Sequence, residues 1–464
     1  MRKITILLTI CFAIGYVLPI IAQSNFNTSL HYTRDGKPTW YDSENGGFET
    51  LTNVPIEDVG CVECHGPTDS NGDPYPTDYE PGCVDCHATG SITTSQDRCL
   101  SCHGREGAII SMGIPDVHRS ASFVCMDCHG EAEVHGDDGV SYASMFEDGA
   151  LQTDCQQAGC HVTIPSATEH TMHADEIHCT SCHASTNLTC YNCHFESQLE
   201  HKKRAYKKLT NFMILVNRDK DGKVHPATFQ SLSYEGNTWV AMGPSVAHTI
   251  VDGSQARTCD DCHHSGSNVI PAIEQYNTTG EMWFATWNDA DSTLNAPSGL
   301  YPLPLDYKRS FKMDFITYNG DPGDPLPTPN NKDWSYVKSV ADGFQLLYAT
   351  PLTEDQMDAM GFDINMISVE RQINAVPDNF KLEQNYPNPF NPTTTIRFSV
   401  PERSEIELVV YDAIGKQIET LISGDHEAGV YEVDFDATGL SSGIYFYQIK
   451  FASFTETRKL VLMK

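Results

Sequence analysis

The feature that most constrains this chain is a cysteine–histidine motif that recurs along its first half. The pattern Cys-x-x-Cys-His occurs seven times, and a stretched version, Cys155-Gln-Gln-Ala-Gly-Cys160-His161, occurs once. The regular copies are Cys61, Cys64 and His65; Cys83, Cys86 and His87; Cys99, Cys102 and His103; Cys125, Cys128 and His129; Cys179, Cys182 and His183; Cys190, Cys193 and His194; and Cys259, Cys262 and His263. This spacing is the signature of covalent haem c attachment: two thiols bond to the porphyrin, and the adjacent histidine binds the iron. The sequence therefore predicts eight covalently attached haems.

Two other kinds of site use paired cysteines, and the repetition argues against both. A zinc site has no need of a histidine after every second cysteine, and a disulfide scaffold has no need of the histidine at all. The chain has 17 cysteines, and Cys11 lies in the N-terminal apolar run, so the remaining 16 form eight pairs with none over. For the stretched motif alone, a disulfide remains the alternative.

Each haem iron takes a second axial ligand if the chain supplies one. Of the 19 histidines, eight belong to motifs and His426 lies in the C-terminal region, which leaves ten for eight irons. His225 and His264 are the two that we expect to be left over. The predicted distal ligands are His31, His118, His135, His170, His173, His178, His201 and His248. Two strong ligands leave no position for a substrate, so this count favours electron transfer over catalysis, without excluding one open haem.

The N-terminus has the composition of a secretory signal peptide. A short basic start precedes an apolar run over residues 4–21 and the small residue Ala22. This pattern predicts a signal peptide over residues 1–22, cut before Gln23. An uncleaved anchor is the alternative, because the run is about long enough to span a bilayer. No other apolar run approaches that length, so we expect no transmembrane segment in the mature chain.

The close spacing of the motifs predicts the fold of the region that carries them. Between Cys61 and His194 the chain is too short per motif to build an ordinary core, so we expect closely packed haems to replace it. The prediction for residues 23–365 is a multihaem cytochrome c fold, mostly coil and short helices with a few strands. Within it, we expect residues 24–60 to form an irregular arm and residues 270–365 a coil-rich cap. Strands are predicted at residues 212–216 and 228–241, with a turn between them.

The region after a linker at residues 366–379 has a different pattern. Residues 380–464 contain no cysteine and are rich in Val, Ile, Tyr and Phe, which alternate with polar residues in short runs. The runs are Thr394–Val400, Glu405–Tyr411, Lys416–Leu421, Val430–Phe435, Gly443–Phe451 and Glu456–Met463. Short alternating runs separated by turns predict a small immunoglobulin-like β-sandwich.

Specific motifs in this C-terminal region add a resemblance. They are Asn385-Tyr386-Pro387-Asn388-Pro389-Phe390-Asn391-Pro392, Val409-Val410-Tyr411-Asp412 with Gly415, Ser442-Gly443-Ile444-Tyr445-Phe446 and the end at Lys464. They resemble the C-terminal sorting domain of cargo of type IX secretion. The resemblance implies that the type IX secretion machinery is a partner and that the protein is secreted or held at the cell surface. An ordinary adhesion-type β-sandwich is the alternative.

The motif-bearing region resembles the multihaem c-type cytochromes as a class, over roughly residues 24–365. Octahaem members include electron carriers, some of which stack into filaments, and oxidoreductases that act on small nitrogen or sulfur compounds. No residue-level match carries over a catalytic set, so the analogy is one of fold. We therefore expect an exported electron carrier that works with redox partner proteins or an extracellular acceptor, with an octahaem oxidoreductase as the alternative. The sequence leaves open whether the protein forms a homo-oligomer or a filament.

The formal net charge of −32 argues against a nucleic-acid partner.

Overall fold

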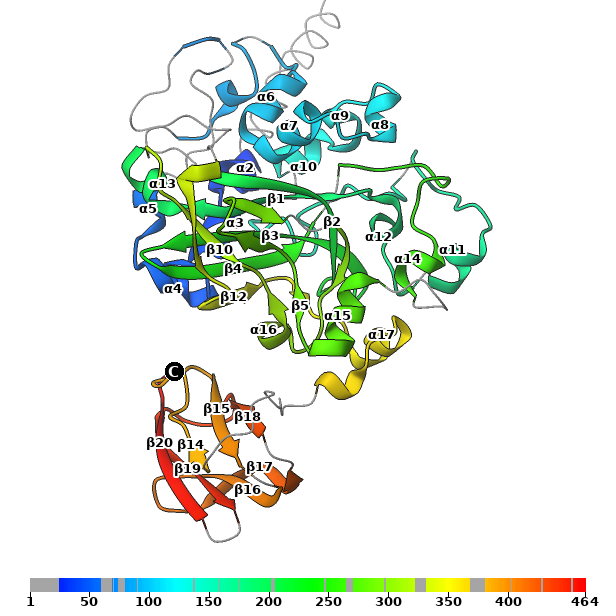
Figure 1. Cartoon of the computed structure of the whole chain (residues 1–464). Helices are drawn as coiled ribbons and strands as arrows, with labels where there is room; N and C mark the ends of the chain where they lie inside the picture. The colour runs from blue at the N-terminus through cyan, green and yellow to red at the C-terminus, as the bar shows by residue number, and fades with distance from the viewer. Residues whose placement is uncertain are drawn as a thin grey trace, which may run out of the picture. The chain divides into compact units, whose positions relative to one another are not determined.

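The computed structural model describes most of the chain that follows the N-terminal apolar run (Figure 1). The described residues are 25–59, 69, 71–73, 80–89, 91–136, 138–157, 159–173, 175–201, 205–245, 248–263, 270–295, 298–321, 331–367, 380–401, 403–426, 429–451 and 454–464. The chain divides into two compact units, Met1–Asp363 and Ile364–Lys464.

Several of the predictions fall on residues outside these ranges. They concern the signal peptide, most of the linker, His264 and the first haem motif, formed by Cys61, Cys64 and His65. The haem predicted at Cys61 and Cys64 therefore stays a prediction from the sequence.

Residues 25–59 form short helices that pack against a sheet, so the prediction of an irregular arm is wrong. Ser29 caps the first helix, because its hydroxyl accepts a hydrogen bond from the Tyr32 N–H at 3.3 Å. Phe48 packs edge-on against Trp239 of the sheet, with ring centres 5.1 Å apart. The helices are α2 (Leu30–Thr33), α3 (Gly36–Tyr41), a 3-10 helix (Ser43–Asn45), α4 (Glu49–Thr52) and α5 (Ile56–Val59).

The segment that carries most of the motifs consists of short helices joined by turns. Among the described residues from 80 to 183, Ile109 and Ala150 are the only buried apolar side chains. This segment therefore has almost no hydrophobic core of its own. Its helices are a 3-10 helix (Cys83–Asp85), α6 (Gln96–Cys102), α7 (Gly104–Ser111), α8 (Val117–Ser120), α9 (Cys125–Cys128), α10 (Glu131–His135), α11 (Thr168–His173) and α12 (Cys179–His183); α14 (Cys259–Cys262) carries the last motif.

A seven-stranded mixed sheet forms the hydrophobic centre of the first unit. Six strands follow the order β12-β4-β3-β1-β2-β13, and β8 pairs with β2. Strand β1 pairs antiparallel with β2 and parallel with β3, so the chain returns to both sides of it. The strands are β1 (Asn187–His194), β2 (Ala205–Arg218), β3 (Val224–Tyr234), β4 (Asn237–Pro244), β8 (Gly299–Pro302), β12 (Gly343–Leu346) and β13 (Ala349–Thr350).

This sheet corrects the prediction that the first unit holds only a few strands. The predicted strand 228–241 is two strands, because Glu235 and Gly236 adopt positive φ angles and turn the chain between β3 and β4. The predicted coil-rich cap at residues 270–365 contains many short strands. They are β5 (Met282–Trp283), β6 (Thr286–Asn288), β7 (Thr293–Asn295), β9 (Phe311–Lys312), β10 (Phe315–Tyr318) and β11 (Trp334–Lys338), in addition to β8, β12 and β13.

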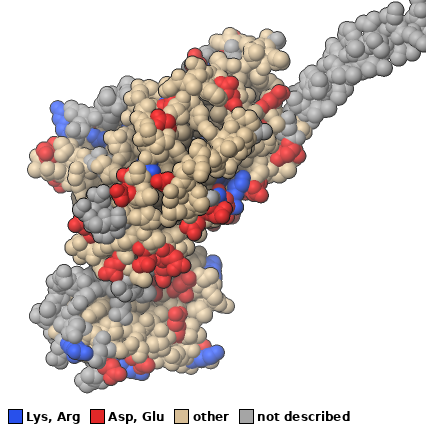
Figure 2. Space-filling model, turned by 90° about the vertical axis from the view of Figure 1, so that its right-hand side faces the viewer, with Lys and Arg blue, Asp and Glu red and all other residues tan. Residues whose placement is uncertain are grey.

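The other helices that the structure describes lie before, between or after these strands in the sequence. They are α13 (Phe195–His201), α15 (Pro271–Thr279), α16 (Tyr307–Ser310), α17 (Glu354–Ala359) and the 3-10 helices Asn331–Asp333 and Ile364–Ile367. None of the helices that the structure describes is long and apolar enough to cross a membrane. On the face shown in Figure 2, Asp and Glu side chains outnumber Lys and Arg, in keeping with the acidic composition of the chain.

The second unit is a β-sandwich, and all six strands predicted from the sequence are present. One sheet has the order β14-β15-β18 and the other β17-β16-β19-β20, with antiparallel pairs throughout. One cluster of buried residues, including Phe398, Val410 and Tyr447, joins the inner faces of the two sheets. The strands are β14 (Lys381–Leu382), β15 (Thr393–Val400), β16 (Ser404–Tyr411), β17 (Gln417–His426), β18 (Gly429–Asp436), β19 (Gly443–Phe451) and β20 (Phe454–Leu462).

Candidate functional site: paired histidines at the cysteine motifs

Motif histidines and non-motif histidines face one another in six places. In each pair the ring centres are between 5.8 and 6.3 Å apart. Two imidazole nitrogens that each bind one metal at about 2 Å place their ring centres about 6 Å apart, so each pair leaves room for one iron. The pairs are His103 with His31, His87 with His135, His161 with His118, His129 with His248, His183 with His170 and His263 with His173.

Most of the motifs share one backbone geometry. In the motif of α9, the His129 N–H donates a hydrogen bond to the carbonyl oxygen of Cys125 at 3.0 Å, and the motifs that end at His87, His103 and His263 close in the same way. Each closed turn places two cysteines three residues apart, on one face of a helical turn. The histidine that follows then leaves the turn beside both thiols.

The stretched motif reaches the same geometry through a wider turn. Gly159 adopts a φ of 90°, a left-handed conformation that glycine reaches without steric cost. The His161 N–H donates to the carbonyl oxygen of Cys155 at 3.0 Å, as in the regular motifs. The two additional residues are thus absorbed within the turn. Cys155 also shares a hydrogen bond with Cys179 of the next motif, which raises the pKa of Cys155 and lowers that of Cys179 to about 6.

Neighbouring motifs also lie close together elsewhere. Burial, followed by the nearby Cys125 thiol, raises the pKa of Cys99 to about 11. Burial, followed by the Cys182 thiol, raises the pKa of Cys262 to about 12. Cys99 and Cys125 belong to different motifs, and so do Cys262 and Cys182. The two motifs of each pair are therefore adjacent in space.

One hydrogen-bond network positions two of the non-motif histidines. Asp116 caps α8, because one carboxylate oxygen accepts hydrogen bonds from the N–H groups of His118 and Arg119. The other carboxylate oxygen accepts from the Ile250 N–H at 2.8 Å, and Arg119 donates to the carbonyl oxygen of His248 at 2.8 Å. The Asp116 side chain is buried, with 6% of the residue surface exposed, so this network is shielded from water. It fixes α8 and the segment that carries His248 relative to each other.

Four paired histidines have a hydrogen-bond partner at Nδ1, which leaves Nε2 for a metal. Ligating histidines are commonly oriented in this way by a carboxylate or a carbonyl group. The Nδ1 partners are Glu133 Oε1 for His129 at 2.6 Å, the Val251 carbonyl for His183 at 3.2 Å, the Ala359 carbonyl for His263 at 2.7 Å and the Pro165 carbonyl for His170 at 2.9 Å.

Burial and hydrogen bonding set the charge of two further groups at these pairs. Burial, together with the neighbouring His103, lowers the pKa of His31 to about 4, so this imidazole is neutral at neutral pH, as an iron ligand must be. Burial raises the pKa of Glu133, but hydrogen bonds from His129, from Thr153 and from backbone N–H groups outweigh it and lower that pKa to about 2. The Glu133 carboxylate is therefore ionised beside the His129 ring.

The distribution of apolar side chains fits haem at these pairs. Of the 20 exposed large apolar residues of the described chain, 12 lie between residues 80 and 183, where buried apolar side chains are almost absent. They are Val84, Ile92, Ile110, Met112, Phe123, Val124, Met126, Val140, Met145, Val162, Ile164 and Met172. Apolar surface in this amount favours an apolar neighbour, and a porphyrin is one. Within the described residues no cluster of three or more His, Cys, Asp or Glu side chains forms a metal site, whereas a haem iron takes two axial side chains.

Two predicted distal ligands do not face a motif histidine of the described residues. His178 stacks on His225, with ring centres 4.1 Å apart, and its Nδ1 bonds the Thr180 hydroxyl at 2.8 Å. His225 Nε2 in turn bonds Asp221 at 2.8 Å. His201 ends α13 with an exposed side chain near Glu200.

The first predicted haem site has no described geometry. Cys61, Cys64 and His65, the predicted thiols and iron ligand of this site, all lie outside the described residues, as does His264, which we expected to be left over. The structure therefore brings together motif histidines and distal histidines at six of the eight predicted sites, and leaves the site of Cys64 untested.

The motif of Cys190, Cys193 and His194 differs from the others because it lies on strand β1. Cys193 is buried in a core cluster. His194 Nδ1 bonds the Ser197 hydroxyl at 2.9 Å, and its Nε2 lies 3.1 Å from Glu196 Oε2. No imidazole of the described residues faces His194. Its ring instead meets Tyr318 edge-on, with ring centres 5.9 Å apart. Nothing in the sequence around Tyr318 marks it as part of a site, so sequence reasoning missed it.

Comparison with known proteins bears on the second unit. Residues 384–463 match the family model of the secretion system C-terminal sorting domain. No curated protein matches the chain. Among solved structures, the X-ray structure of the endo-beta-1,4-mannanase from Thermotoga petrophila is similar at 12% sequence identity and a TM-score of 0.13. That match covers 34% of this chain and 32% of the mannanase chain, and so low a TM-score carries no argument about fold.

The family match settles what the second unit does. A C-terminal sorting domain directs a protein through type IX secretion, so this protein is exported and is either secreted or held at the cell surface. The resemblance of the Asn-Tyr-Pro-Asn-Pro-Phe-Asn-Pro segment and its following strands to such a domain is thereby confirmed. The secretion machinery that reads this domain is one partner of the protein.

Proposed function

We propose that the first unit is an exported multihaem c-type cytochrome that relays electrons. It holds up to eight covalently attached haems and connects redox partner proteins with an acceptor or donor outside the cell. The observation that carries the proposal is the set of six histidine pairs with ring centres 5.8 to 6.3 Å apart, each of which joins a motif histidine to a non-motif histidine.

The pairing favours relay over catalysis. Bound haem supplies one-electron iron chemistry, and the identity of the axial ligands decides whether the iron also binds a substrate. A haem at such a pair would be held by two histidines, as by His129 and His248, which would leave its iron no position for a substrate. The closeness of neighbouring motifs, such as those of Cys99 and Cys125, suits transfer from one haem to the next.

A spectroscopic measurement tests the proposal directly. The oxidised protein is examined by electron paramagnetic resonance, and the reduced protein by visible spectroscopy with and without carbon monoxide. We expect low-spin signals from the six paired sites and no carbon monoxide adduct at them. Haem content below six per chain, or carbon monoxide adducts at most of the haems, would overturn the proposed relay.

A second candidate function rests on the motif of strand β1. Because His194 meets Tyr318 and not a histidine, a haem held by Cys190 and Cys193 would have one axial position without an imidazole from the described residues. An open position suits an oxidoreductase that acts on a small nitrogen or sulfur compound. A high-spin signal from about one haem in eight, lost when nitrite or hydroxylamine is added, would support this function.

A further inference from the structure

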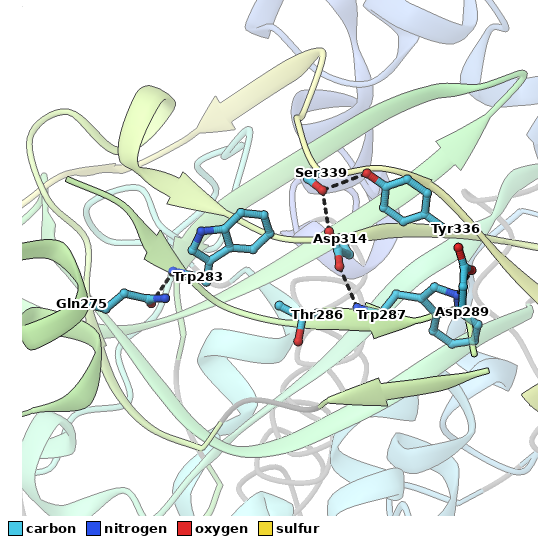
Figure 3. A pocket seen from close by; sticks show the side chains of 8 residues that line it. All are labelled: Gln275, Trp283, Thr286, Trp287, Asp289, Asp314, Tyr336 and Ser339. Atoms are coloured by element: carbon cyan, nitrogen blue, oxygen red, sulfur yellow. Dashed lines mark hydrogen bonds between the residues drawn. The ribbon is translucent and has the colours of Figure 1, made fainter. Parts of the chain in front are cut away.

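The first unit contains a pocket of about 590 Å³ that the haem motifs do not use. Its lining residues come from helix α15, from strands β5, β6 and β11, and from the loops after β6, between β9 and β10, and after β11 (Figure 3). Three of its lining residues are aromatic, Trp283, Trp287 and Tyr336, and two are acidic, Asp289 and Asp314. Figure 3 shows Asp314 between the two indoles. Among the described residues, no lysine or arginine lines it.

The two indole rings are fixed by their N–H groups. Trp283 Nε1 donates to Glu281 Oε2 at 2.9 Å, and Trp287 Nε1 donates to Asp289 Oδ1 at 2.7 Å. Trp287 also packs against a small core cluster that includes Tyr318. With their N–H groups engaged by carboxylates, the indoles offer a ligand their π faces and not a hydrogen-bond donor. The π face of an indole attracts cations.

Asp314 is the feature that points to a ligand. Only 6% of the residue surface is exposed, and its carboxylate accepts two hydrogen bonds, from the Trp287 N–H at 2.7 Å and the Ser339 hydroxyl at 2.6 Å. A carboxylate has about four acceptor positions, so about two remain. Within the described residues no lysine or arginine forms an ion pair with it. A buried carboxylate without a basic partner is costly, and a cation in the pocket would offset that cost.

Asp314 also belongs to the structure around strand β1. Its carbonyl oxygen accepts a hydrogen bond from Asn192 Nδ2 at 3.1 Å and another from the Tyr191 hydroxyl. Both donors are buried residues of the β1 motif. The backbone at Asp314 is therefore held in place, and the carboxylate is preorganised before any ligand arrives.

We infer that this pocket binds an organic cation, a molecule that carries a substituted ammonium group. The ammonium group would lie against the indole faces of Trp283 and Trp287, with Asp289 and Asp314 as its counter-charges. The pocket volume exceeds that of one ammonium group, so the remainder of the ligand occupies the rest. The inference concerns binding alone and does not depend on the haem content of the protein.

Two ligands of one shape separate charge from size. Choline and 3,3-dimethylbutan-1-ol have the same outline, but only choline is charged. Isothermal titration of each into the purified full chain should give a choline Kd about tenfold lower, since only the charged ligand is attracted by the indole faces and the carboxylates. Equal affinities, or no binding of choline, would overturn the inference.

Two variants locate the site. Asp289→Asn keeps an oxygen that accepts from Trp287 Nε1 but removes the charge, and it should weaken choline binding by about tenfold. The matched control is Glu419→Gln, which removes an exposed carboxylate from the second unit and should leave the choline Kd unchanged. A Kd that is the same in Asp289→Asn and Glu419→Gln would show that choline responds to the overall negative charge and not to this pocket, and would count against the inference.

Discussion

The motif-bearing segment and the sorting domain are stabilised in opposite ways. In the described residues from 80 to 183, Ile109 and Ala150 are the only buried apolar side chains, whereas a single cluster of the sorting domain buries 19 residues. The sorting domain therefore carries the hydrophobic core that a small domain needs. The motif-bearing segment exposes apolar side chains and holds its histidines in pairs, so the proposed haems would be its main source of stability.

The largest expected effect follows directly from this difference. If the chain is produced without haem attachment, residues 80–183 should lose their protection against proteolysis. The conformational entropy that this segment loses on folding is then not balanced by buried apolar surface. Residues 380–464 should remain folded. Limited proteolysis with mass spectrometry should show cleavage in the motif-bearing segment rising roughly tenfold or more, with the sorting domain unchanged. Equal protection of residues 80–183 with and without haem would break the comparison.

The same difference explains what the sequence predicts well. In the sorting domain each strand alternates apolar and polar residues over a short run, and its antiparallel partner is reached through turns, so local pattern is sufficient. The motif histidines are equally local, because the ligand and both thiols lie within a few residues. Six of the eight predicted distal histidines lie opposite a motif histidine.

Sequence reasoning fails where position depends on distant partners. Strand β12 pairs parallel with β4, which lies about a hundred residues earlier, and no local pattern announces such a pairing. His178 resembles the other distal candidates in sequence, yet it stacks on His225 because the turn between β2 and β3 brings Asp221 and His225 to it. Tyr318 and Asp314 acquire their roles only through the packing of β10 near β1.

The second prediction compares a helical motif with the strand motif. The double variant Cys99→Ala/Cys102→Ala and the double variant Cys190→Ala/Cys193→Ala should each lose one haem in the intact mass, because each removes both thioether bonds. Only the α6 variant should also lose protection around its own motif, since β1 stays paired with β2 and β3.

Hydrogen exchange with mass spectrometry measures that second difference. An increase of roughly tenfold in exchange at α6 and α7, with little change in β1, is the expected pattern. A mass for the β1 variant that falls only by the two sulfur atoms would show that the strand motif carries no haem, which would reduce the proposed number from eight to seven. Equal exchange in both segments would mean that the strand motif depends on haem as much as the helical motifs do.

A smaller effect is expected from the loss of one axial ligand. His248→Ala leaves His129 without the imidazole that faces it, so carbon monoxide should bind about one haem in eight of the reduced protein. The matched control is His201→Ala, because His201 is exposed and faces no motif histidine of the described residues. Visible difference spectra measure both variants. If both variants formed the same amount of carbon monoxide adduct, His248 would be no more an iron ligand than the exposed His201, and the proposed pairing would be contradicted.

The smallest effect should arise in the sorting domain, where a single hydroxyl is one contact among many. The Tyr447 hydroxyl donates to the Glu383 carbonyl at 2.7 Å and accepts from the Asn385 N–H at 2.8 Å. Tyr447→Phe leaves both backbone groups without this partner, so the domain should lose about 1–3 kcal/mol of unfolding free energy. Tyr411→Phe is the control, since the Tyr411 hydroxyl has no hydrogen bond to lose among the described residues, and it should change this free energy by less than about 0.5 kcal/mol.

The pH dependence of this last difference identifies its origin. Burial raises the pKa of Tyr447 to about 12, above the value near 10 of an unfolded tyrosine. A raised pKa in the folded state means that the stabilisation is fully present below pH 10 and is lost as the pH rises through about 12. The difference in unfolding free energy between the parent chain and Tyr447→Phe should therefore be constant up to about pH 10 and become smaller above it. Hydrogen exchange of residues 380–464 measures this difference. A difference in unfolding free energy that stays constant through pH 12 would show that the folded domain does not favour the protonated Tyr447 hydroxyl. In either case Tyr447→Phe should leave the hydrogen exchange of residues 80–183 unchanged, because the two regions draw their stability from different sources.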